Sequence, residues 1–308
     1  MITALTSRGR RFLQWSDNAI NPIVVKELRQ AINGKFASVL LVLFLSVSVL
    51  ALTLTLLNTS QGDLDAEAGR SLLLTMQGIL VGTCILLLPL YTSVRLASER
   101  SDTNTDLMFI TTIRPRAIIW GKLAAALVLS VLVYSACMPF MTLTYLLRGV
   151  DLPTILLILA LGFSQVVVAV QLGILAACLS VSRALRTVVG LLLVGGLVFL
   201  LYSVIGGSIA ITRPGGLGGV PPNEFWASVG AYVTGVFCLV WLLYTLAVAI
   251  VTPSSANRIL PIRITFTAIW LISGGVFWAF AIDQNNAELL EIWLVLSVML
   301  FGLGMLIA

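Results

Sequence analysis

The chain has 308 residues, of which 59% are hydrophobic and 10% are charged, and its formal net charge at pH 7 is +5. Because a soluble domain carries about 25% charged residues, this composition excludes an ordinary soluble protein and predicts an integral membrane protein. The sequence contains no histidine, which excludes catalytic triads, proton relays and metal sites that depend on imidazole.

A short amphipathic helix is predicted within the polar and basic segment that covers residues 1–36. Asn21-Pro22 is typical of a helix start and Asn33-Gly34 of a helix end. Apolar residues between them fall on one stripe: Val24, Val25, Leu28, Ala31 and Ile32. Polar and charged residues fall on the opposite side: Lys26, Glu27, Arg29 and Gln30. We therefore expect a helix on the inner membrane face, although a simple basic anchor for topology would carry the same pattern.

Long apolar segments follow, and about 20 such residues are enough to cross a bilayer as a helix. Helices are expected rather than a barrel, because backbone groups in lipid must pair within their own segment and no alternating pattern is present. The expected fold is therefore an all-α polytopic bundle of about eight transmembrane helices. Their expected ranges are 37–57, 71–94, 118–147, 154–181, 188–204, 225–251, 264–282 and 289–306.

The polar stretch between the second and third spans, residues 95–122, has an internal pattern of its own. Thr103 followed by Asp106 is a capping-box signal for a helix start, and residues 107–110 are apolar. Pro115 disfavours helix at the residue before it. The pattern predicts a helix of about two turns, largely apolar, on the water side of the membrane, and such a helix is expected to dock on a partner or on its own bundle. An ordinary loop whose apolar residues dip into the lipid interface would also fit.

Basic residues predict the orientation of the bundle. Of the 18 lysines and arginines, 15 fall in the N-terminal segment or in the three loops that would share its side of the membrane. The positive-inside rule then places the N-terminus in the cytoplasm and the chain in the cytoplasmic (inner) membrane. This distribution accounts for the net positive charge without a nucleic-acid ligand.

Two separate motifs resemble one membrane protein family. The first is the run Glu99-Arg100, Thr105-Asp106-Leu107, Thr111-Thr112-Ile113, Ile118 and Gly121-Lys122. It resembles the signature of permease subunits of ATP-binding-cassette (ABC) transporters of the type-2 export family. The second, NPIVVKELR at 21–29, is similar to the opening of many such permeases, in which a surface helix precedes the first span. Residues 108–110 depart from the family pattern, in which leucines are commoner.

The resemblance implies a division of the chain and a partner. Residues 1–36 would be a cytoplasmic segment, 37–251 a six-span permease core, and 252–308 an additional two-span hairpin without a family counterpart. The helix near 103–112 would be the coupling helix, which seats in a groove of a separate ATPase subunit, and two permease copies or paralogues would assemble as a dimer. Direction of transport, as export, rests on the same resemblance.

The resemblance also implies roles for particular residues. The ATPase contact would involve Glu99, Thr103, Asp106, Leu107, Met108, Phe109 and Ile110. Interfacial or structural roles would fall to Asn21, Pro22, Lys26, Glu27, Leu28, Arg29, Gly121 and Lys122. Among these, Lys122 would fix the base of the third span, and the N-terminal helix would brace it.

Residues 206–224 are the only glycine- and proline-rich segment of the chain. The segment is too apolar for a solvated linker and too interrupted for a span. The family resemblance implies short re-entrant helices here, which would cap the outer end of a transport pathway. A flexible outer loop fits the composition equally well.

Chemistry-bearing groups are scarce, and this limits what the chain can do. The phosphate-binding pattern GxxxxGK[ST] is absent, so ATP and Mg²⁺ would be bound by a partner, and we expect no enzyme activity, cofactor or metal on this chain. The four cysteines lie inside apolar runs without CxxC spacing and are expected to be packing residues. The strongest polar residues within the spans are Gln77, Gln165 and Gln171. Of these, Gln165 and Gln171 could line a transport pathway, but interhelical hydrogen bonds suit them better.

Two other functions are compatible with so little chemistry. A non-transporting membrane scaffold or assembly factor needs only spans and an interaction surface. A secondary transporter is less favoured, because it typically has buried carboxylates or broken helices in repeated halves, and neither is visible. An ATPase partner would separate the ABC permease interpretation from both.

Overall fold

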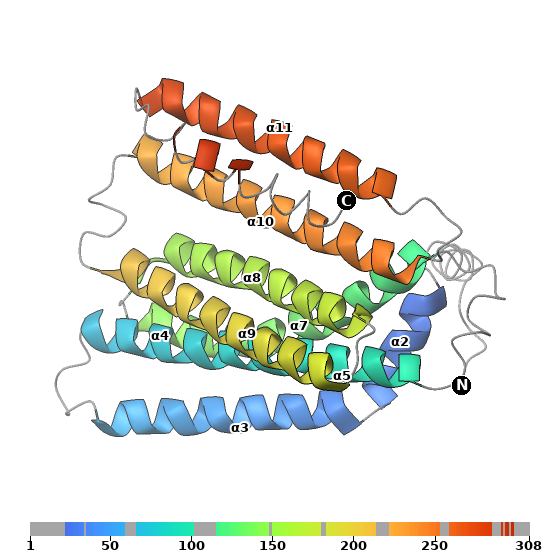
Figure 1. Ribbon diagram of the computed structural model, residues 1–308. Coiled ribbons are helices and arrows are strands. Elements are labelled where there is room, and N and C mark those ends of the chain that lie inside the picture. Colours follow the sequence, from blue (N-terminus) through green and yellow to red (C-terminus); the bar gives the residue numbers. More distant parts are fainter. Residues whose placement is uncertain are drawn as a thin grey trace, which may run out of the picture.

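The computed structural model describes residues 22–33, 35–58, 66–101, 115–147, 150–179, 183–213, 222–252 and 259–284, together with 291, 293–295 and 297–298. Within these ranges the chain is helical apart from a few residues at helix ends, and no strand occurs. Figure 1 shows the long helices lying side by side, with α3 at one edge and α11 at the other. The short helix α2 is inclined to them at one end of the bundle (Figure 1).

The helices begin and end as follows: α2 Pro22–Asn33, α3 Lys35–Asn58, α4 Ala66–Gly82, the π-helix η1 Thr83–Leu87, α5 Leu88–Ser101, α7 Pro115–Leu146, α8 Leu152–Cys178, α9 Arg183–Thr212, α10 Pro222–Val251 and α11 Ile259–Gln284. Three of these, α4, η1 and α5, follow one another without a gap and form a single long element. Short helix α2 has the bounds that its flanking Asn-Pro and Asn-Gly pairs predict.

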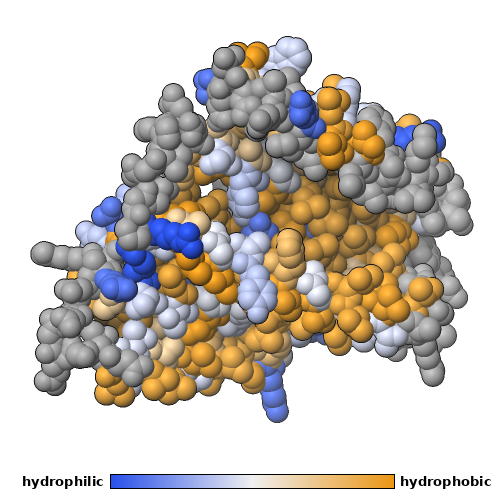
Figure 2. Space-filling view, turned by 60° about the vertical axis from the view of Figure 1, so that its left-hand side comes forward, coloured by the Kyte–Doolittle hydropathy of each residue, from blue (hydrophilic) through white to orange (hydrophobic). Residues whose placement is uncertain are grey.

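Seven helices in the described ranges are long and apolar enough to cross a membrane. Their outward faces carry large exposed apolar side chains, such as Leu57 on α3 and Leu191 on α9, each 76% exposed. Figure 2 shows the same property on one face of the molecule, which is mostly hydrophobic and distinctly hollowed. Soluble proteins rarely expose so much apolar surface, because its contact with water is unfavourable. The chain is therefore a multi-pass membrane protein, as its composition predicts.

The expected eighth span does not belong to this set of seven. Only residues 291, 293–295 and 297–298 of the range 289–306 are described. Trp293 lies against α11, where its indole N–H donates to the Ser273 hydroxyl at 3.2 Å and its ring centroid is 5.4 Å from that of Trp270. This part of the chain therefore folds back on α11, and the count of eight spans stays a prediction.

Two expected boundaries are corrected by the helix ends. Residues 95–101, expected as the start of a polar loop, are the last turns of α5. Residues 206–212, expected in a re-entrant or loop segment, complete α9. Both extensions are compatible with the sequence, because neither stretch contains a proline, and α9 ends at the residues that precede Pro214.

Helix α8 occupies the centre of the bundle. It packs against α5, α7, α9 and α10, whereas α11 packs mainly against α10. Six of its residues have no exposed surface: Val166, Ala169, Val170, Gln171, Ile174 and Cys178. Close approach of α8 to the first turn of α5 depends on Gly173, because a Cβ there would lie 2.7 Å from the carbonyl oxygen of Pro89.

Replacing Gly173 by Ala should therefore destabilise the bundle. Overpacking a well-packed contact costs about 1–3 kcal/mol, and here the obstructing atoms are backbone, which cannot rotate away. We expect a lower free energy of unfolding for Gly173→Ala in an SDS titration from mixed micelles. Gly190→Ala on α9 is the matched control, since a Cβ there meets nothing within 4 Å. Equal stabilities of the two variants would contradict this packing.

Candidate functional site

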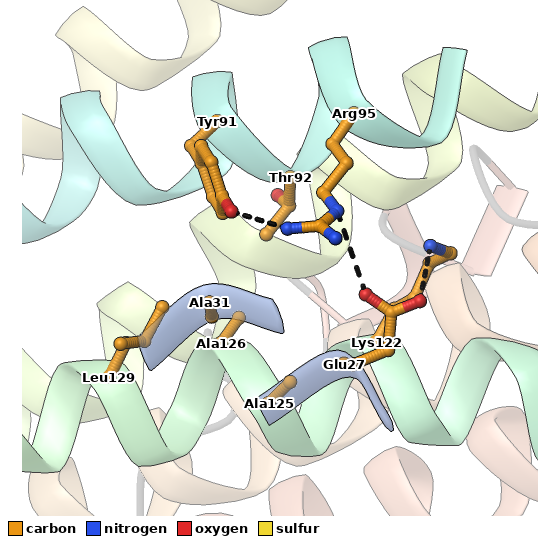
Figure 3. Close-up of a pocket in the computed structure, with 9 residues that line it drawn as sticks. All are labelled: Glu27, Ala31, Tyr91, Thr92, Arg95, Lys122, Ala125, Ala126 and Leu129. Carbon is orange, nitrogen blue, oxygen red and sulfur yellow. Dashed lines mark hydrogen bonds and ion pairs between the residues drawn. The ribbon is translucent and has the colours of Figure 1, made fainter. Parts of the chain in front are cut away.

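Three helices meet at one end of the bundle, around the two ends of the segment 102–114. They are α2, the last turns of α5 and the first turns of α7. Each contributes side chains to one small buried cluster (Figure 3). The segment 102–114 itself lies outside the described residues. The cluster thus joins α5, which precedes this segment, to α7, which follows it. We take the cluster as the candidate functional site.

A single carboxylate holds the three helices together. Glu27 of α2 accepts a hydrogen bond from the Lys122 ammonium of α7, with Nζ and Oε1 3.0 Å apart. Its other oxygen, Oε2, lies 3.8 Å from Nε of Arg95 on α5. Figure 3 shows the carboxylate between the two cations. Glu27 is 8% exposed and Lys122 is 6% exposed, so this pair is largely removed from water.

Aromatic packing fixes the direction of the Arg95 side chain. Its Nη1 donates to the hydroxyl of Tyr91, one turn earlier on α5, at 2.5 Å, and its guanidinium carbon lies 5.8 Å from the centre of that ring. The Tyr91 ring is in turn stacked on Phe36 of α3, with centroids 3.7 Å apart. A guanidinium held by a phenol and a carboxylate has little rotational freedom, so the orientation of Arg95 is fixed by contacts within the chain.

Small residues allow α2 to approach α7 closely enough for this ion pair. Ala31 lies one turn after Glu27, on the same face of α2, and is buried. Opposite it on α7 are Ala125 and Ala126, and all three line a cavity of about 20 Å³ beside the cluster (Figure 3). Such a volume can hold about one water molecule. Glu27 is among the residues that line this cavity.

The three charged residues of the cluster stabilise the bundle only when all of them are present. A buried pair gains little net stability, because desolvation offsets the Coulomb attraction, but removing one partner leaves an uncompensated charge and costs about 3–5 kcal/mol. Here one carboxylate serves two cations from two different spans. Separation of α5, α7 or α2 from the others would expose this cost, so the cluster resists relative movement of the three helices.

The expected site residues divide into described and undescribed groups. Thr103, Asp106, Leu107, Met108, Phe109, Ile110 and Asn21 lie outside the described residues. Pro22 and Lys26 lie on α2, and Glu99 lies on α5, before the segment rather than within it. Gly121 and Lys122 are buried on α7, Leu28 is half-buried and Arg29 is exposed. The structure therefore brings Glu27 together with Lys122 and leaves the predicted ATPase contact undescribed.

One expectation about α2 is wrong in a way that matters. Glu27 was expected on the polar side of a surface helix, yet it is buried against α7, while Val25 of the expected apolar stripe is 37% exposed. The cause is the ion pair. The charge-assisted hydrogen bond from Lys122 stabilises Glu27 on the face of α2 that packs against α7, and this contact outweighs the burial of the apolar stripe. Sequence reasoning also missed Tyr91 and Arg95, for which spacing along one segment gives no signal.

Interhelical hydrogen bonds are expected of Gln165 and Gln171, and one of these two residues makes such a bond. Gln77, for which the sequence predicts no bond, makes one as well. Gln77 of α4 donates to the Ile158 carbonyl of α8 at 3.4 Å. Gln165 of α8 donates to the Tyr232 hydroxyl of α10 at 2.7 Å. Gln171 is fully buried, and neither of its side-chain polar atoms has a hydrogen-bond partner among the described residues.

The described residues offer no alternative chemical centre. All four cysteines are buried and unpaired with one another, as expected of packing residues. Among the residues that the structure describes, no group of three or more acidic or cysteine side chains could hold a metal ion. Comparison of the chain with models of protein families, with curated proteins and with solved structures gives no match.

Neutralising Glu27 should reveal the cluster as a coupled unit. Glu27→Gln leaves the buried Lys122 and the partly buried Arg95 without their shared carboxylate, so we expect a loss of about 3–5 kcal/mol in the free energy of unfolding in mixed micelles. Glu27→Gln with Lys122→Met removes one of those cations and should recover part of the loss. Glu67→Gln, an exposed carboxylate in the first turn of α4, is the control and should change stability by less than about 0.5 kcal/mol. Additive effects of the two substitutions would refute the coupling.

Proposed function

We propose that this chain is the membrane-spanning permease subunit of an ATP-driven ABC transporter of the export type. In this proposal a separate ATPase subunit binds ATP and Mg²⁺ and docks on the helix near 103–112, on the cytoplasmic side. Two permease subunits, identical or paralogous, work as a dimer in the inner membrane. The chain itself catalyses no reaction. Its task is to change the conformation of the bundle when the ATPase subunits close.

The observation that supports this function best is the Glu27 cluster. A docking segment can drive a membrane bundle only if force on it reaches the spans rather than being lost in a loose loop. Arg95 lies near the end of α5 and Lys122 near the start of α7, and the same carboxylate contacts both. A push on the segment between these helices would therefore move two spans and α2 as one body.

The sequence of the undescribed segment supports the same proposal. Residues 107–110 are Leu-Met-Phe-Ile, directly after a capping-box start, and they join two cytoplasmic helix ends in the proposed orientation. Four successive large apolar residues at a water-exposed position require a cover. A groove on a soluble ATPase would provide one. The chain has no phosphate-binding motif of its own, so an energy source on another subunit is also required.

The decisive experiment isolates the tagged chain from its native membranes with its partners. We expect a partner protein that carries GxxxxGK[ST], and vanadate-sensitive ATP hydrolysis by the purified complex. Changing Leu107 and Phe109 together to Glu should abolish both, because two apolar anchors are each worth about 2 kcal/mol or more at an interface. Membrane insertion of the variant should be unchanged, as measured by its resistance to carbonate extraction.

Leu185→Glu is the matched control for this experiment. Like Leu107 and Phe109, Leu185 is apolar. It is half exposed and lies in the first turn of α9, in the second expected cytoplasmic loop. This variant should keep both the partner and its ATP hydrolysis. An intact complex after the Leu107 and Phe109 changes would refute the proposed contact. A purified chain without any ATPase would refute the function and favour the scaffold.

A further inference from the structure

A second cavity lies in the middle of the bundle, away from the Glu27 cluster. It occupies about 240 Å³ between α8, α9 and α10. Helices α9 and α10 both pack against α8 but not along each other, so the cavity lies in the gap between them. Its lining is mainly apolar, with four polar side chains: Ser203, Ser208, Gln165 and Tyr232. None of the lining residues is charged.

Two of these polar groups, Gln165 and Tyr232, form a hydrogen-bonded wall between α8 and α10, while Ser203 and Ser208 bond carbonyls of their own helix. The Tyr232 hydroxyl accepts from Gln165 Nε2 at 2.7 Å, lies 3.0 Å from the Ser164 hydroxyl and donates to the Leu161 carbonyl at 3.2 Å. These bonds fix the Gln165 carboxamide at the cavity wall. Its oxygen accepts no hydrogen bond from any residue that the structure describes, and Gln165 is not fully buried. A residue that lines the cavity thus has an acceptor that no described residue uses.

The depth of this wall distinguishes it from the lipid interface. Helix α10 has 30 residues, and at 1.5 Å per residue it is about 45 Å long, longer than the hydrocarbon core of about 30 Å. Tyr232 comes ten residues after Pro222, about 15 Å from that end of the helix. If the helix is centred, its hydroxyl lies within the hydrocarbon. Acyl chains that fill a cavity at this depth cannot satisfy a carboxamide oxygen, whereas a ligand with hydroxyl groups can.

We propose that this cavity binds an uncharged amphiphile that carries hydroxyl groups on an apolar body, of the acylglycerol type. The apolar lining takes the hydrocarbon part, and Gln165 accepts a hydrogen bond from a ligand hydroxyl. The absence of lining charges disfavours phosphate or carboxylate head groups. That such a ligand is the transported cargo rests on the proposed function. Its binding here does not, because no ATPase is needed for it.

Two neighbouring glycines of α9 allow a closely matched test. A Cβ at Gly206 or at Gly207 meets nothing within 4 Å, but only Gly207 lines the cavity. The full chain would be placed in phosphatidylcholine nanodiscs without any ATPase and labelled with a photoreactive monoacylglycerol. We expect Gly207→Leu to lower labelling of α8 to α10 about tenfold, the change that 1.4 kcal/mol of lost binding produces. Gly206→Leu should label like the parent chain.

A second variant tests the polar wall rather than the space. Gln165→Leu removes the unused acceptor, and we expect labelling by the monoacylglycerol to fall about fivefold, as for the loss of about 1 kcal/mol of hydrogen bonding. A photoreactive hydrocarbon without hydroxyls should label weakly and should not respond to this change. Equal labelling by the two probes, or equal effects of the two glycine variants, would overturn the proposal. Failure to label with an ATPase partner present in native membranes would leave the proposed function standing and remove this ligand.

Discussion

The arrangement at one end of the bundle depends on a single requirement, which is that a carboxylate taken out of water must keep cations beside it. Glu27 meets this requirement with Lys122 at 3.0 Å and Arg95 at 3.8 Å. Because the two cations belong to different spans, the position of α2 fixes the distance between α5 and α7. Stacking of Phe36 on Tyr91 adds α3 to the same assembly. The four helices around this corner are therefore positioned by one another and not by the lipid.

A continuous set of packed contacts leads from this corner to the cavity in the middle of the bundle. Helix α5 meets α8 where Gly173 touches Pro89, and α8 meets α10 where Gln165 bonds Tyr232. Neither contact leaves room for the helices to shift independently. The first brings the backbone of Gly173 close to that of Pro89, and the second is a hydrogen bond of 2.7 Å. A displacement of α5 would therefore reach α8 and alter the walls of the cavity. This gives the proposed docking segment and the proposed ligand site a physical connection within one chain.

Much of the fold could be predicted from the sequence, because long apolar segments in a membrane have few alternatives to a helix. The bounds of α2 followed from its Asn-Pro and Asn-Gly pairs, and the interhelical bond of Gln165 followed from the cost of a polar group in lipid. The orientation of α2 could not be predicted from the sequence. A helical stripe shows which residues share a face of the helix, but not which of them contacts a residue of another helix. Glu27 and Lys122 are 95 positions apart, and Arg95 joins them only through the packing of three helices. A single sequence carries no signal for such a contact.

The π-helix η1 has a consequence for this corner. An i→i+5 turn takes up one residue more than an i→i+4 turn, so everything after Leu87 is offset by one position, or about 100° around the helix axis. The face of α5 that carries Tyr91 and Arg95 is therefore set by a local wide turn in mid-membrane rather than by the register of α4. If that turn tightened to α-helical geometry, Arg95 would swing away from Glu27 while the transmembrane segment remained unbroken. The contact of Arg95 with Glu27 at the end of the second span therefore depends on the π-helical register of η1.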